Sequence, residues 1–370
     1  MRILHLTRDY PPRINGGLST AVGSLVTALD RFPDLEHRVL SFDAWRPKAR
    51  GSTAVPMGGA RGVHRLRSPD ALEGAVRWGT SFAPHLVHVH DPRLWEVATD
   101  LSPVRVLTMH VAHGAAALRR GIETQGARAE REAVAEAHVV TVGHPAMRAD
   151  VPPTTARLEV APLAVDDHAL AREAAASPRP QAVALVVGRF AEVKGLYAIV
   201  AAWRHLRERG VKLELHLAGG LVDSPKADRR WRRKLTEAAG RHGEELTFLG
   251  WLDPEALSRA YGRSSMLVAA SVYETFGLAC LEAMLHGLPV IVGRASGLRS
   301  LVRPDVTGLL TDGNPAELAA AMAYLAADGP VRVRMGRQAA QDARARWLWG
   351  RGHAAKWREL YRELAHSHVG

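Results

Sequence analysis

The feature that most constrains the fold is an alternation of short apolar runs with amphipathic segments, which continues along the chain. The runs have the length of strands and are apolar without a period of two, so each would bury both of its faces. Strands of this kind that alternate with helices form parallel sheets covered by helices on both sides. The sequence therefore predicts an α/β fold of doubly wound, Rossmann-like parallel sheets.

The alternation runs twice, with a break between the two rounds. In the first round we expect helical segments at 17–30 and 115–136 and strands at 2–7, 37–42, 86–90, 104–110 and 138–143. The stretch 171–183 is rich in Ala, Ser and Pro and is the expected linker. In the second round we expect helices at 195–210, 225–241, 254–261 and 277–286, and strands at 182–188, 212–219, 246–250, 265–271 and 289–293.

A chain of 370 residues is too long for one ordinary core and suits two domains that face a cleft. We expect an N-terminal domain at 1–175 and a C-terminal domain at 182–345. The tail is helical in pattern, and we expect residues 346–370 to pack back toward the N-terminal domain. In doubly wound sheets ligands bind beyond the carboxyl ends of the strands, so the residues that follow each strand are the candidates for function.

Composition excludes several classes of protein. No apolar stretch is long enough to span a membrane and the N-terminal apolar run is too short for a secretory signal, so we expect a cytoplasmic protein. The single cysteine, Cys280, rules out a disulfide framework and a cysteine-based zinc site. The net charge of +11 comes mostly from dispersed Arg, without a basic tract interleaved with aromatic residues, which argues against nucleic-acid binding.

The stretch SVYETFGLACLEAM, at 271–284, carries two carboxylates around a predicted helix start. Glu274 follows a strand, Gly277 opens the helix, and Glu282 lies just past its first turn. A helix N-terminus binds anions through its N–H groups and dipole, and Gly277 lets a phosphate approach the backbone. Two carboxylates on either side of a phosphate fit the hydroxyls of a nucleoside diphosphate sugar, although an isolated pair of this kind is more often two solvated glutamates.

Two cations follow the strand AVALVVG in the same half of the chain. Arg189 comes directly after this strand and Lys194 stands a few residues further on, before Gly195. An Arg fork and a Lys point charge can neutralise a diphosphate and stabilise the charge that grows on it as it leaves, without a metal ion. This second constellation favours a functional interpretation of Glu274 and Glu282.

Together these motifs resemble the retaining glycosyltransferases of family 4, which have the GT-B fold. The resemblance rests on VGRFAEVKG at 187–195, on the two glutamates with Phe276-Gly277 between them, and on HGLPVIV at 286–292. It extends over the whole chain through weaker N-terminal signals: Asn15-Gly16-Gly17, Asp91 after a strand, the strand end Thr108-Met109-His110, and PLAVD at 162–166.

The resemblance implies a role for each of these positions. Arg189 and Lys194 would hold the diphosphate, Glu274 the sugar hydroxyls near the reacting carbon, and Glu282 the ribose hydroxyls. The backbone N–H groups of Phe276, Gly277 and Leu278 would bind the distal phosphate. Gly16 and Gly17 would let the N-terminal backbone close over the diphosphate, and His110 would lie beside the donor sugar and the acceptor.

The implied reaction is metal-independent transfer of a hexose-type sugar from a nucleotide diphosphate donor to an acceptor hydroxyl, with retention and with no cofactor. The resemblance favours a UDP-linked donor. The acceptor stays open among small molecules, saccharides and lipid carriers. The family often has an acid near Ser300; here residues 295–300 contain none and include Arg299, a departure that bears on donor choice.

Three further groups of residues allow other interpretations. A metal site from His88, His90, His110 and His113 is disfavoured against hydrogen-bonded histidines, because they lie on different strands without Cys or an H-E-x-x-H motif. Asp166-Asp167 is expected in a turn. Residues 118–132 mix Arg with Glu, which favours a solvated face and leaves peripheral membrane contact as an open alternative.

Two alternative functions remain. A non-hydrolysing nucleotide-sugar epimerase shares the two-domain architecture, and a non-catalytic protein could keep a nucleotide-sugar site for regulation. The presence of Arg189, Lys194 and Glu274 favours an enzyme over a binding protein.

Overall fold

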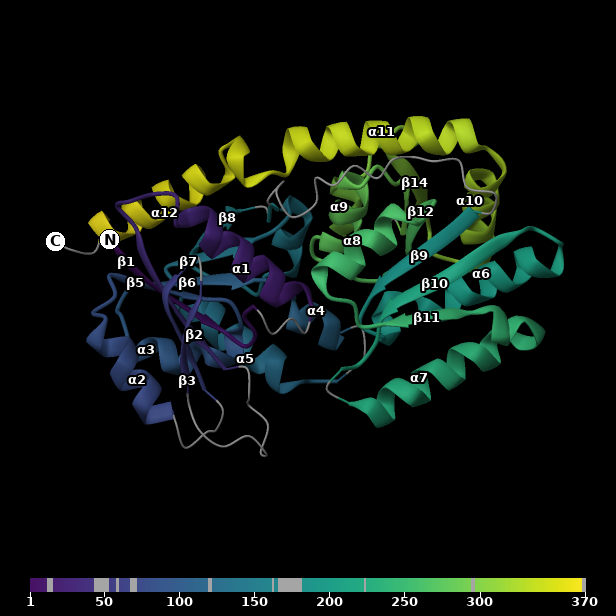
Figure 1. The fold of residues 1–370 in the computed structure, drawn as a ribbon. Helices are drawn as coiled ribbons and strands as arrows, with labels where there is room; N and C mark the ends of the chain where they lie inside the picture. Colours follow the sequence, from purple (N-terminus) through teal and green to yellow (C-terminus); the bar gives the residue numbers. More distant parts are fainter. Residues whose placement is uncertain are drawn as a thin grey trace. The chain divides into compact units, whose positions relative to one another are not determined.

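The chain forms two compact units in the computed structural model (Figure 1). Unit 1 comprises Met1–Asp166 together with Trp347–Gly370, and unit 2 comprises Asp167–Arg346. The structure describes residues 1–11, 16–42, 53–57, 60–66, 72–118, 122–161, 163–165, 182–222, 224–293 and 297–367. The expected linker falls largely outside this described part, and its last two residues, Ala182 and Val183, already belong to a strand.

Unit 1 is built on a sheet of eight described strands in the order β3-β4-β2-β1-β5-β6-β7-β8. All neighbours are parallel except β3 and β4, which form an antiparallel pair at one edge. The strands are β1 (Arg2–Thr7), β2 (Glu36–Ser41), β3 (Thr53–Met57), β4 (Ala60–Arg65), β5 (Leu86–Val89), β6 (Arg105–Met109), β7 (Val139–Val142) and β8 (Arg157–Val160).

Helices from both ends of the chain share the core of unit 1. The helices are α1 (Gly17–Leu29), α2 (Leu72–Ser81), α3 (Trp95–Thr99), α4 (His113–Leu118), α5 (Gln125–Glu136) and α12 (His353–Ser367). Apolar side chains of α1 and α12, such as Leu25 and Trp357, pack together with Ile3 of β1 in one buried cluster. Arg358 and Arg362 of α12 also pair with Asp34, which precedes β2. Residues 353–367 are therefore part of the N-terminal sheet's own core.

Unit 2 has a wholly parallel sheet in the order β11-β10-β9-β12-β13-β14. Its strands are β9 (Ala182–Gly188), β10 (Leu213–Gly219), β11 (Thr247–Gly250), β12 (Met266–Ala269), β13 (Val290–Gly293) and β14 (Gly308–Thr311). The chain builds outward from β9 to β11 and then returns to place β12 on the other side of β9. The topological switch point of this sheet therefore lies at the carboxyl ends of β9 and β12, where ligands bind in such folds.

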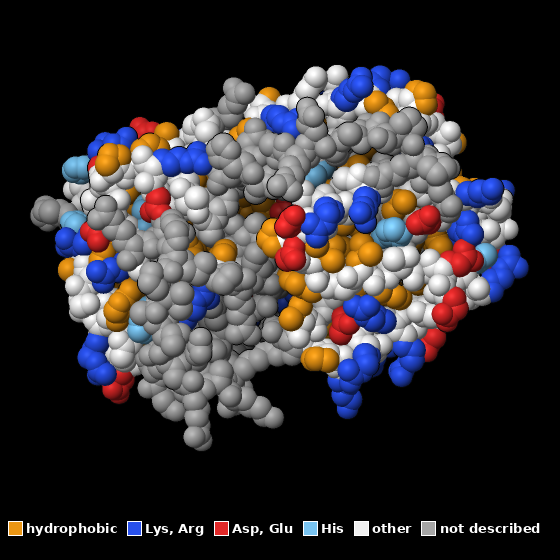
Figure 2. All heavy atoms as spheres, in the orientation of Figure 1, with side chains coloured by type: hydrophobic (Ala, Val, Ile, Leu, Met, Phe, Trp, Pro, Cys, Tyr) orange, Lys and Arg blue, Asp and Glu red, His pale blue; other side chains and the backbone are white. Residues whose placement is uncertain are grey.

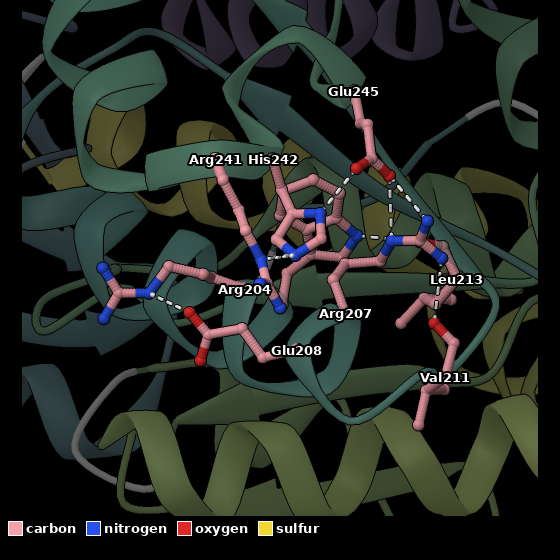
Figure 3. Close-up of polar contacts among 9 residues, drawn as sticks. Arg204, Arg207, Glu208, Val211, Leu213, Arg241, His242 and Glu245 are labelled. Carbon is pink, nitrogen blue, oxygen red and sulfur yellow. Dashed lines mark hydrogen bonds and ion pairs between the residues drawn. The ribbon is translucent and has the colours of Figure 1, made fainter.

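The helices of unit 2 are α6 (Leu196–Glu208), α7 (Pro225–Ala238), α8 (Pro254–Gly262), α9 (Leu278–Leu285), α10 (Pro315–Ala327) and α11 (Gly329–Arg346). Helix α6 begins directly after Lys194-Gly195, and polar contacts anchor its far end (Figure 3). There Arg207 donates to Glu245 Oε2 from Nε and Nη2, at 3.0 and 2.6 Å, and to Val211 O at 3.0 Å. His242 contacts the other oxygen of Glu245 at 2.5 Å, so α6 is tied to the turn before β11.

Several elements differ from the sequence prediction. The single expected segment 115–136 is two helices, α4 and α5, and the segment 225–241 ends as a helix at Ala238, followed by a 3₁₀ turn at Gly240–Glu245. Four strands were not predicted: β3, β4, β8 and β14. Among the described helices, none combines the length and the apolar character that crossing a bilayer would require.

Candidate active site

A glycine turn brings the ends of β9 and β12 together in unit 2. Gly195 has a positive φ of 65°, and a Cβ there would overlap the carbonyl oxygen of Ala270, which follows β12. The N–H of Val272 donates to Val193 O at 2.9 Å, which ties the two loops along their backbones. The turn that carries Lys194 is thus pressed against the segment that leads to Glu274.

The predicted cation and the predicted sugar carboxylate meet at this junction. Lys194 Nζ donates to Glu274 Oε2 at 2.5 Å, and the two side chains are 30% and 21% exposed. They are only partly covered, so a ligand could reach either group. Arg189 is exposed and directly follows Gly188, the last residue of β9. The structure therefore places three of the predicted donor-binding residues at the switch point of the sheet.

Helix α9 begins immediately after this pair. Its N-cap, Gly277, has φ 92°, and a Cβ there would overlap Leu298 Cδ2, so the position requires glycine. Phe276 is buried and Leu278 is the first helical residue. The N–H groups of a helix's first turn have no partner within the helix, and the helix dipole adds positive potential there. The start of α9 thus offers groups that suit a phosphate, and phosphate binding there stays a prediction.

Glu282 lies within α9, and its carboxylate is covered by the neighbouring helix α8. Tyr261 Oη donates to Glu282 Oε2 at 2.8 Å and also lies 3.2 Å from the carbonyl oxygen of Ala279. Burial raises the pKa of Glu282 to about 7, against the opposing effect of the Tyr261 hydrogen bond. This carboxyl group therefore exchanges its proton near neutral pH, a property that the sequence reading missed along with Tyr261.

The remaining predicted residues belong to unit 1. Gly16 is the N-cap of α1, with φ 148°, and Gly17 is the exposed first residue of that helix. His110 directly follows β6, and its Nε2 lies 3.0 Å from Nδ1 of His90. Burial lowers the pKa of His110 to about 4 although the charge of Asp91 acts in the opposite direction. His110 is consequently a neutral imidazole at pH 7.

The hydrogen bond of His110 continues through a row of histidines that the sequence reading did not connect. His90 Nε2 lies 3.1 Å from His5 Nδ1, and His5 Nε2 lies 3.0 Å from His37 Nδ1. His88 bonds to Tyr361 and Thr108, at 2.6 Å in each case. His5 and His88 are register partners on the parallel strands β1 and β5, and His37 lies on β2 two residues before Val39, the partner of His5 there.

Ring nitrogens of His5, His88 and His90 lie within 4.8 Å of one another, a spacing that a metal ion could use. Both nitrogens of each ring already have a hydrogen-bond partner, however. A divalent ion would also bring two positive charges into a group of buried neutral rings, at a high desolvation cost. The geometry therefore favours a hydrogen-bonded network over a metal centre.

Charged groups surround His110 at the carboxyl edge of this sheet. Asp91 is buried and accepts from Arg93 Nε and Nη2 at 2.8 and 2.6 Å, and Arg8 Nη1 lies 3.6 Å from its carboxylate. These arginines hold the pKa of Asp91 below its usual value despite burial. Buried Glu130 accepts from the backbone N–H groups of His113 and Gly114 at 2.6 and 2.8 Å and so fixes the loop that follows His110.

Two parallel-sheet α/β units of this kind are the architecture of the GT-B fold. Residues 167–342 match the family model described as "Glycosyl transferases group 1". The match covers a little under half of the chain and makes this region similar to the group 1 glycosyltransferases.

Relatives with known names agree with this assignment. The chain is 35% identical over 164 residues to a D-inositol 3-phosphate glycosyltransferase of Corynebacterium efficiens, covering 44% of this chain and 38% of that protein. It is 29% identical over 290 residues to an enzyme of the same name from Streptomyces bingchenggensis, covering 76% of this chain and 61% of that protein. The matched region thus spans less than two thirds of each relative.

Solved structures share the fold along nearly the whole chain. Sucrose-phosphate synthase from Thermosynechococcus elongatus aligns with a TM-score of 0.83 at 22% identity, covering 99% of this chain and 100% of that one. The Anabaena protein Alr3699/HepE, solved with UDP and glucose, aligns with a TM-score of 0.74 at 17% identity, covering 97% and 99%. At these identities the likeness establishes the architecture alone.

Proposed function

We propose that this protein transfers a sugar from a nucleotide diphosphate sugar to an acceptor hydroxyl, with retention of configuration and without a metal ion. The observation that carries the proposal is the pairing of Lys194 with Glu274 at the switch point of unit 2, next to the glycine-capped start of α9. A cation, a helix N-terminus and a carboxylate provide complementary groups for a diphosphate and a sugar that is attached to it.

In this proposal the donor binds along the start of α9. Arg189 and Lys194 neutralise the diphosphate, the first-turn N–H groups of α9 hold the distal phosphate, and Glu282 holds the ribose. Positive groups at the leaving phosphate stabilise the charge that develops in the transition state, which is the role a metal ion fills elsewhere. A UDP-linked donor is favoured by the similar fold of HepE, which was solved with UDP-glucose.

Retention without an enzymic nucleophile implies attack on the same face from which the phosphate leaves. The acceptor hydroxyl then passes its proton to the departing phosphate oxygen as the new glycosidic bond forms. The neutral state of His110 supports a hydrogen-bonding role for it in place of a charge-stabilising one.

The edge of unit 1 favours an acceptor that carries a negative charge. Arg8 and Arg93 are 40% and 33% exposed and share one buried carboxylate, Asp91, so some of their N–H groups remain to donate to an anionic acceptor. The relatives named D-inositol 3-phosphate glycosyltransferase suggest a polyol phosphate as the first acceptor to test. By contrast, Lys and Arg are interspersed with Asp and Glu on the surface of Figure 2, which does not favour nucleic acid.

The direct experiment incubates the purified chain with UDP-glucose and other nucleotide sugars, with and without inositol or inositol phosphate. Transfer that needs the acceptor supports the proposal, and NMR of the anomeric proton in the product decides between retention and inversion. Rearrangement of the donor alone would identify an epimerase, and donor binding without turnover would identify a binding protein. Loss of activity in EDTA that magnesium or manganese restores would contradict metal independence.

A further inference from the structure

Unit 1 carries a continuous row of imidazoles across four neighbouring strands. His37 lies in β2, His5 in β1, His90 just after β5 and His110 just after β6, and the strands are adjacent in the order β2-β1-β5-β6. Consecutive rings are joined by nitrogen–nitrogen hydrogen bonds of 3.0, 3.1 and 3.0 Å. We call these four residues the histidine chain. None of the roles proposed above requires the three members beyond His110.

All four rings are neutral, which restricts how their protons can be arranged. Burial holds the pKa values of His5 and His90 well below the ordinary value and lowers those of His37 and His110 to about 4. A neutral imidazole has one N–H and one lone pair, so each inner ring that donates on one side must accept on the other. The histidine chain therefore has only two complete arrangements, with all its hydrogen bonds running toward His110 or all running away from it.

We propose that the histidine chain runs toward His110 and thereby holds His110 as its Nδ1–H tautomer, a fixed hydrogen-bond donor at the carboxyl edge of the sheet. In this arrangement His37 Nδ1–H donates to His5 Nε2, His5 Nδ1–H to His90 Nε2, and His90 Nδ1–H to His110 Nε2. The remaining proton then resides on Nδ1 of His110. His90, His5 and His37 are accordingly positioning residues for His110.

The two ends of the histidine chain select this direction. His37 Nε2 is buried and has no hydrogen-bond partner within the described part of the chain. An orphaned N–H is rarer in folded proteins than an under-used acceptor, so a lone pair at this nitrogen is preferred to a proton. At the other end, the negative charge of Asp91 acts on His110. It favours the arrangement in which the terminal N–H of the histidine chain is on His110, because a negative charge attracts the positive end of the chain's dipole.

This direction gives His110 a defined chemical role. A ring that receives a hydrogen bond at Nε2 and carries its proton on Nδ1 can donate to a sugar or phosphate oxygen but cannot accept a proton at that nitrogen. That conclusion about the reaction rests on the proposed function, because a transfer in which the leaving phosphate takes the acceptor's proton needs no base. The tautomer itself is a property of unit 1 and can be measured without activity.

The first experiment records long-range ¹H–¹⁵N spectra of the full chain labelled at the histidine rings. We expect the Nδ1–H pattern for His110, His90, His5 and His37. An Nε2–H pattern at His110 overturns the proposal, as does stoichiometric bound metal whose removal shifts His5, His88 and His90. His90→Phe removes the donor to His110 Nε2 and should convert the single His110 tautomer into a mixture. His64→Phe alters a histidine of β4 outside the histidine chain and should leave the His110 signals unchanged.

The second experiment compares His110→Asn with His110→Leu in the transfer assay. The Asn amide places an N–H close to the position of Nδ1, so this variant should retain activity within about tenfold, whereas His110→Leu should lose about 100-fold or more, the usual cost of a missing transition-state donor. Equal losses in the two variants overturn the donor role. If the wild-type chain shows no transfer, the proposed function fails and the spectra still decide the tautomer.

Discussion

Lys194 Nζ lies 2.5 Å from Glu274 Oε2, although the two residues are 80 positions apart in the chain. The contact exists because the turn at Gly195 packs against Ala270, without room for a side chain between them. In the ligand-free protein each charge of the pair therefore neutralises the other. A diphosphate that binds Lys194 must compete with this carboxylate, and Glu274 becomes available to sugar hydroxyls at the same time.

The first prediction concerns the two cations. Lys194→Ala and Arg189→Ala should each lower turnover by about 2 to 4 kcal/mol of transition-state stabilisation, because their charges match the leaving diphosphate. Nucleoside binding should change much less. Steady-state kinetics with Lys212→Ala as the control, a lysine that is exposed before the start of β10, would check this. Near-normal turnover in both variants would show that the diphosphate does not bind at this end of β9.

The second prediction separates the two glutamates. Glu282→Ala should weaken both the nucleotide diphosphate and the intact donor by about 1.5 to 3 kcal/mol, because both ligands contain the ribose. Glu274→Ala should abolish transfer without weakening the nucleotide diphosphate, and it should even tighten that ligand, because Lys194 loses its competing partner. Calorimetric titration of each variant with both ligands measures the difference.

One result would contradict the proposed contacts of Glu274 with the sugar and of Glu282 with the ribose. If both variants lost equal affinity for nucleotide and for donor, the two carboxylates would serve only to shape the start of α9. Glu274→Gln is the matched control for charge, since it removes the ion pair with Lys194 but keeps a side chain of nearly the same size.

The third prediction follows from the raised pKa of Glu282. The folded state keeps this proton up to about pH 7, whereas the unfolded chain releases it near the ordinary glutamate pKa of 4.5. More protons are bound in the folded state between these values, so the free energy of unfolding should fall as pH rises from about 4.5 to 7, by an amount on the order of 3 kcal/mol. Denaturant titrations at several pH values in this range give the free energy of unfolding of wild type and of Glu282→Gln. The fall of that free energy with rising pH should be smaller in Glu282→Gln, by this contribution.

The fourth prediction is that the protonation state of Glu282 also controls nucleotide binding. A ribose hydroxyl needs an acceptor, so the nucleotide should prefer the ionised form of Glu282 and bind more tightly as pH rises through about 7. Binding at pH 6 should release a proton, which makes the calorimetric heat depend on the ionisation enthalpy of the buffer. Glu282→Gln should abolish this buffer dependence, and its persistence in that variant would assign the proton to another group.

The sequence predicted the central strands, and the position of the candidate donor residues after them, because both leave local signals. β9 and β12 are apolar throughout, and the residues after them carry the charged motifs. Three of the four missed strands have weaker patterns: β3 contains Pro56, β4 contains Gly62 and two arginines, and β8 is only partly buried. Tyr261 was missed for another reason, since its partner Glu282 is 21 residues away and only the packing of α8 on α9 joins them.

The fifth prediction tests the glycine turn that brings Lys194 to Glu274. Gly195 and Gly210 both have positive φ, of 65° and 78°, but a Cβ at Gly210 would meet nothing within 4 Å whereas one at Gly195 would overlap Ala270 O. Gly210→Ala should cost about 1 kcal/mol for the backbone alone. Gly195→Ala should cost roughly 1 to 3 kcal/mol more, because the strand end must move. Chemical denaturation of the two variants measures how much free energy of unfolding each loses, and the difference is the cost of the overlap with Ala270. Equal losses would mean that the turn at Gly195 moves to make room for the methyl group at little cost.

Because α12 packs on the N-terminal sheet, unit 1 can complete its fold only after the last part of the chain has been synthesised. Trp349, Trp357 and Tyr361 are core residues of unit 1, yet they are translated after every residue of unit 2. Until they emerge, the nascent first half exposes the apolar surface around Ile3 and Leu29 that they will cover. Unit 2, a single continuous stretch, can fold earlier, while the exposed apolar surface of the unfinished first half is a place where aggregation can begin before synthesis is complete.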